Sequence, residues 1–76
     1  MTDQQTITKI NDATNDLEIV TRLINRGRGE EAKEYGAELW TEVFRAVGFS
    51  GSQEVLSAQM NFEKKYAVIR QGLSNI

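Results

Sequence analysis

The chain has 76 residues, a formal net charge of −2, and no cysteine, histidine or proline. The absence of cysteine and histidine excludes disulfides, thiolate or imidazole metal sites, thiol nucleophiles and a histidine general base, which leaves carboxylates as the candidate acids, bases or ligands. The length predicts one domain, 1–76, with a core only just large enough for stability, and the slight acidity argues against general attraction to nucleic acid or anionic membranes.

The first predicted helix covers about residues 3–26. Thr2 and Gln5 have the T-x-x-Q spacing of a capping box, in which each side chain bonds the backbone amide of the other residue. One face of this helix carries Ile7, Ile10, Ala13, Thr14, Leu17, Val20, Thr21 and Ile24. Ile19 and Leu23 project from a different side, so they need a second cover.

Residues 25–29, with the sequence NRGRG, predict a tight connection. Gly27 is suited to the left-handed backbone that ends a helix, and Arg22, Arg26 and Arg28 complement the last carbonyl groups. A glycine-bearing, arginine-rich loop is also a candidate anion site. It lacks the GxxxxGK[ST] order and the preceding strand of a phosphate-binding loop, so the pattern favours helix termination.

The second predicted helix, about residues 30–47, has the clearest amphipathic pattern of the chain. Its apolar side chains fill an arc of about 200°, whereas packing on one neighbour requires roughly 100°. We therefore expect it to be the central helix of a small bundle. Trp40 and Phe44, one turn apart, are interpreted as core residues, with a binding hot spot as the alternative if one flank stays uncovered.

Gly48 predicts the end of the second helix, and a third helix follows at about residues 52–72 with Ser50 or Ser52 as its cap. Its first apolar stripe consists of Val55, Ala58, Phe62, Tyr66, Ile69 and Leu73. Its second stripe consists of Leu56, Met60 and Ala67. The second stripe exceeds what one neighbouring helix covers.

These elements predict an all-α fold, a small up-down-up three-helix bundle around the 30–47 helix. Ile19, Leu23, Leu56 and Met60 are surplus to such a bundle. A homodimer that buries them against their copies is the simplest expectation, and a partner protein is the alternative.

Four glutamates follow one another at intervals of four residues on the second helix: Glu30, Glu34, Glu38 and Glu42. Like charges at this spacing repel, so the stripe is mildly unfavourable unless something positive faces it. A solvated face is the simplest interpretation, and a docking surface for a basic patch on a partner is the sharper one. Acid–base catalysis or metal binding is disfavoured, because an exposed convex face offers no burial to shift pKa values.

Residues 40–66 superficially resemble a helix-turn-helix, in which the second helix enters the major groove of DNA. Phe44 stands where that motif usually has a small residue, if Gly48 is the turn glycine. Glu54 opens the candidate recognition helix where a base or phosphate contact is expected. A dimeric DNA-binding regulator is therefore the alternative function and not the first.

The sequence predicts a protein–protein interaction module, an adaptor, regulator or inhibitor that acts by occupying a surface. No enzyme activity, cofactor or metal is expected. The expected partners are a second copy and a protein with a basic patch, with neither nucleic acid nor a membrane. The first nine residues lack a basic and apolar leader, which indicates a cytosolic chain, and the small size suits a phage or mobile-element accessory protein.

Overall fold

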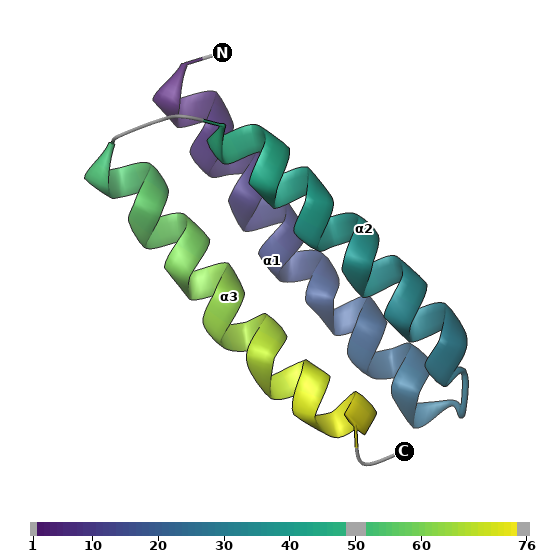
Figure 1. Cartoon of the computed structure of the whole chain (residues 1–76). Coiled ribbons are helices and arrows are strands. Elements are labelled where there is room, and N and C mark those ends of the chain that lie inside the picture. Colours follow the sequence, from purple (N-terminus) through teal and green to yellow (C-terminus); the bar gives the residue numbers. More distant parts are fainter. Residues whose placement is uncertain (1, 49–51, 75–76) are drawn as a thin grey trace.

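The computed structural model describes residues 2–48 and 52–74, which form three α-helices and no strand (Figure 1). α1 covers Asp3–Asn25, α2 covers Gly29–Val47 and α3 covers Gln53–Ser74. These bounds differ from the predicted limits by no more than two residues. The predicted all-α class is confirmed. None of the described helices combines the length and the apolar character needed to cross a lipid bilayer.

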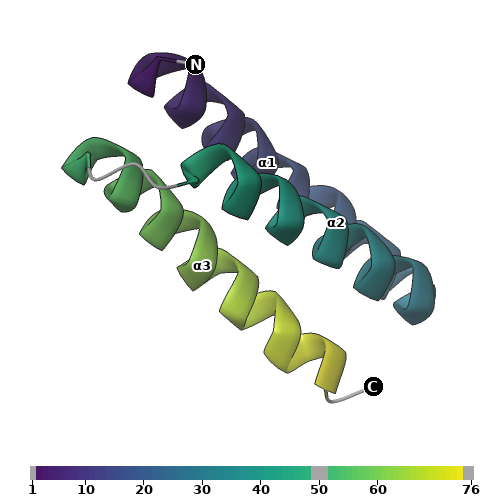
Figure 2. The same cartoon turned by 45° about the horizontal axis from the view of Figure 1, so that its top comes forward.

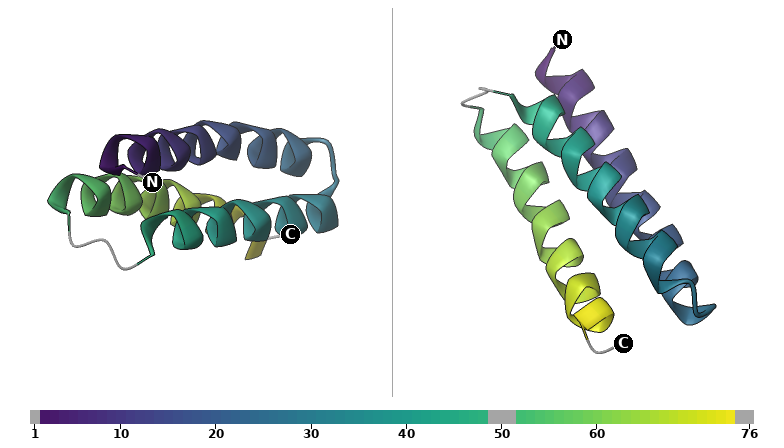
Figure 3. Two further views of the ribbon diagram at one scale, coloured as in Figure 1. Left: turned by 90° about the horizontal axis from the view of Figure 1, so that it is seen from above. Right: turned by 45° about the vertical axis from the view of Figure 1, so that its right-hand side comes forward.

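The helices lie lengthwise along a bundle whose Cα atoms extend over 38 × 17 × 16 Å. α1 and α3 run in one direction and α2 runs in the opposite direction (Figure 1). α1 forms one layer, and α2 and α3 together form the other (Figures 2 and 3). One side of the α2–α3 layer is thus covered by α1, and the opposite side is open.

Both ends of α1 follow the predicted capping chemistry. Thr2 Oγ1 accepts from the Gln5 amide at 3.2 Å, and Gln5 Oε1 accepts from the Thr2 amide at 3.0 Å, which confirms the capping box. At the other end Gly27 has a φ of 76°, and the Arg28 amide donates to the Leu23 carbonyl at 2.9 Å. This is the bond of a Schellman motif, and it confirms that Gly27 ends the helix.

α2 begins without a side-chain cap. Arg28, just before its first residue, forms an ion pair with Glu31 at 3.5 Å, and both side chains are exposed, so the pair stabilises the helix little. The last residue of α2 is Val47, and Gly48 caps the helix, as predicted. Gly48 has a φ of 52°, which residues other than glycine rarely adopt.

α3 begins immediately after Ser52, one of the two predicted caps. Ser52 Oγ accepts from the Val55 amide at 3.5 Å, a long bond that satisfies one free amide of the first turn. The other predicted cap, Ser50, lies outside the described residues.

The core joins all three helices and consists of Ile10, Ala13, Leu17, Val20, Ala32, Leu39, Val43, Val55, Phe62 and Leu73. α1 packs extensively against both α2 and α3, whereas the contact between α2 and α3 is smaller. The prediction that the 30–47 helix is central is therefore wrong, because α1 is the shared helix. Thr6 and Thr14 are buried on α1, and the Thr14 hydroxyl donates to the Ile10 carbonyl at 2.8 Å. Threonine thus widens the buried face of α1 beyond its apolar residues.

The contact between α2 and α3 depends on a glycine in mid-helix. A Cβ atom added at Gly36 would lie 3.1 Å from Cε2 of Tyr66, which is tighter than nine in ten real Cβ contacts. The Tyr66 ring in turn stacks on the buried Phe62 ring, with centroids 5.7 Å apart. Gly36 therefore lets the Tyr66 ring lie against the α2 backbone.

Candidate protein-binding surface

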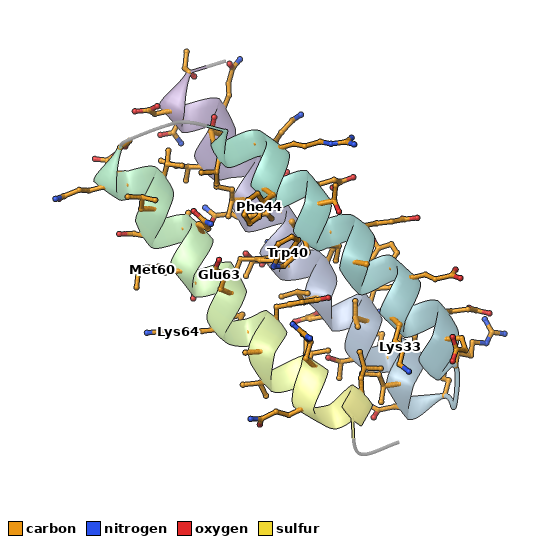
Figure 4. All side chains as sticks on the ribbon, in the orientation of Figure 1. Lys33, Trp40, Phe44, Met60, Glu63 and Lys64 are labelled. Carbon is orange, nitrogen blue, oxygen red and sulfur yellow. The ribbon has the colours of Figure 1, made fainter. Side chains whose placement is uncertain are left out.

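Two aromatic side chains of α2 stay exposed beside α3. Trp40 is 39% exposed and Phe44 is 52% exposed, and their ring centroids are 4.5 Å apart. Both project from α2 on its open side toward α3 (Figure 4). The interpretation of these residues as core is wrong. Around the axis of α2, at 100° per residue, Trp40 lies about 100° and Phe44 about 140° from the buried Leu39. Both are therefore at the edge of the apolar arc, beyond the part that α1 covers.

The second apolar stripe of α3 is also exposed. Leu56 is 42% exposed and Met60 is 57% exposed. Met60 projects from the outer edge of α3, next to Lys64 (Figure 4). Ala67, the third member of this stripe, is also exposed.

The Gly36–Tyr66 contact places the two exposed pairs at the same height along the bundle. Because α2 and α3 are antiparallel, Trp40 is level with residue 62 and Phe44 is level with residue 58. The aromatic pair on α2 and the Leu56–Met60 pair on α3 are therefore at similar heights, with Met60 on the outer edge of α3 (Figure 4). We call the surface formed by Trp40, Phe44, Leu56, Met60, Ala37 and Ala67 the α2–α3 face.

Polar side chains border the α2–α3 face. Lys33 of α2 and Glu63 of α3 project on its open side (Figure 4). Glu63 Oε1 accepts from Gln59 Nε2 at 3.3 Å, which holds this carboxylate along α3. An apolar centre with a charged border is the usual anatomy of a protein interface.

Ile19 and Leu23 lie away from this face, on the side of α1 that carries Asp12 and Asp16. Ile19 is 40% exposed. Leu23 is half-buried and packs against the core. The chain itself thus supplies part of the cover for this pair, and Ile19 is an isolated exposed residue and not part of a larger apolar patch.

All four glutamates of the predicted stripe are exposed: Glu30, Glu34, Glu38 and Glu42. Within the described residues no ion pair involves them. Residues four apart are rotated by about 40°, so the stripe turns around α2 from the border of the α2–α3 face toward α1. Glu42 lies with Asp12, Asp16 and Arg45 around a hollow between α1 and α2.

The pKa of Tyr35 reflects its burial and the negative charge on this side of the bundle. Burial raises the pKa of its phenol above the ordinary value of 10.0, and the nearby carboxylates of Asp16, Glu42 and Glu38 raise it further. A phenolate here would lose hydration and face like charges. The side of α2 opposite the α2–α3 face therefore has a negative potential.

We expect Tyr35 to ionise above pH 10, and stability to depend on pH accordingly. Because its pKa is raised by folding, its contribution to stability is fully present below pH 10 and is lost as the pH rises through the higher folded value. A spectrophotometric titration of tyrosinate in a Tyr66→Phe variant would measure Tyr35 alone, since the chain has two tyrosines. Glu42→Gln should lower the Tyr35 pKa. Ionisation at or below pH 10 would contradict the burial of this side chain.

Comparisons with known proteins add no functional assignment to this surface. Family models, curated proteins and solved structures gave no match to the chain. Within residues 2–48 and 52–74, no group of three or more acidic side chains is placed to hold a metal ion. The candidate site is therefore defined by the exposed side chains of this chain alone.

Proposed function

We propose that this protein is a protein–protein interaction module that binds its partners through the α2–α3 face and the carboxylates of α2. In this proposal the up-down-up bundle acts as an adaptor, regulator or inhibitor by occupying a surface, without a cofactor or a catalytic residue. The observation that carries the proposal is the exposed Trp40–Phe44 pair on α2, with Leu56 and Met60 also exposed on α3. Tryptophan and other aromatic residues are enriched among the residues that dominate binding energies.

The apolar area that stays exposed on Trp40 and Phe44 favours a surface that binds a partner over a surface that only contacts water. A fully covered aromatic side chain buries about 150–250 Å². The exposed fractions of Trp40 and Phe44 thus leave roughly 100 Å² on each ring. At about 25 cal/mol per Å², covering both would contribute about 5 kcal/mol before the costs of association. This gain is comparable with the whole net stability of a small domain.

The charge of α2 suggests the chemistry of a partner. α2 has five glutamates against Lys33 and Arg45, a net charge of −3. Its exposed carboxylates are not neutralised by ion pairs within the described residues, apart from the surface pair of Glu31. We therefore propose a partner protein with a basic patch, whose arrival would relieve the repulsion along the stripe.

The alternative function, a dimeric DNA-binding regulator, receives no support from the helix arrangement. The two helices of a helix-turn-helix cross at about 90–120°. α2 and α3 lie side by side and antiparallel (Figures 1 and 3). The three cations of α3, Lys64, Lys65 and Arg70, are too few for strong phosphate binding.

Affinity capture with the protein as bait tests the proposed function. We expect a basic protein from an extract of the source organism to be retained by the wild-type chain and by Val68→Ser, which changes an exposed residue beside the hollow between α1 and α3. Trp40→Ser combined with Phe44→Ser should lose it. Glu34→Gln, Glu38→Gln and Glu42→Gln together should retain it less, and high salt should weaken capture by the wild type. Retention of the same proteins by all variants, or of none by the wild type, would contradict the proposal.

A further inference from the structure

We draw no further inference here: the strongest candidate, the open side of α2 and α3 with the exposed Trp40 and Phe44, carries nothing beyond the proposed function because nothing in the structure shows what covers it.

Discussion

Phe62→Ala is expected to destabilise the protein by about 3–5 kcal/mol, the usual cost of replacing a fully buried phenylalanine. Phe62 has no exposed surface, it belongs to the core cluster, and it supports the Tyr66 ring that contacts α2. A small domain has a net stability of about 5–15 kcal/mol at most, so this loss removes a large part of it. Urea unfolding followed by circular dichroism would measure the change.

Trp40→Ala is the matched control for that experiment. Trp40 is the larger side chain, but it is 39% exposed and lies outside the core cluster. Its replacement should therefore cost less than half as much as Phe62→Ala. Equal costs would place Trp40 in the core and contradict the exposed aromatic pair.

Gly36→Leu is expected to destabilise the protein by about 1–3 kcal/mol, because its side chain must occupy space that the Tyr66 ring fills. An added Cβ alone lies 3.1 Å from that ring, so the longer side chain forces α2 and α3 apart. Gly36→Ala should be nearly neutral. Its gain in helix propensity, about 1 kcal/mol, is offset by the tight contact with the ring.

Gly72→Ala provides the comparison for the glycine variants. Gly72 lies in α3 with nothing within 4 Å of an added Cβ, so alanine should stabilise the chain by up to about 1 kcal/mol. Thermal unfolding of the three variants would rank them. If Gly36→Ala stabilised the protein as much as Gly72→Ala, the contact between Gly36 and Tyr66 would be absent.

The helix ends could be predicted because they depend on local chemistry. The Thr2–Gln5 capping box and the glycines at 27 and 48 act within a few residues of themselves, and each lies where the sequence pattern placed it. The central helix could not be predicted in the same way. The apolar pattern gives α2 the widest apolar face, whereas the buried face of α1 also includes Thr6 and Thr14, whose hydroxyls donate to the carbonyls of Thr2 and Ile10. A buried threonine and a solvated one look alike in a sequence.

The exposed apolar side chains could be predicted in part. The second stripe of α3 was identified as surplus, and Leu56 and Met60 are exposed. Trp40 and Phe44 were assigned to the core because an apolar arc does not reveal which of its edges a neighbour covers. The deciding quantity is the position of α3, which depends on contacts between residues far apart in the sequence, such as Gly36 and Tyr66.

Trp40 also gives the molecule a built-in optical probe. It is the single tryptophan of the chain, and it stands on the α2–α3 face next to Phe44. Indole emission shifts to shorter wavelength as water leaves the ring, so covering the face changes the colour of the light that the whole protein emits. Any occupant of the face can therefore be followed by intrinsic fluorescence in an unlabelled sample, while changes confined to the α1 side leave the spectrum unaltered.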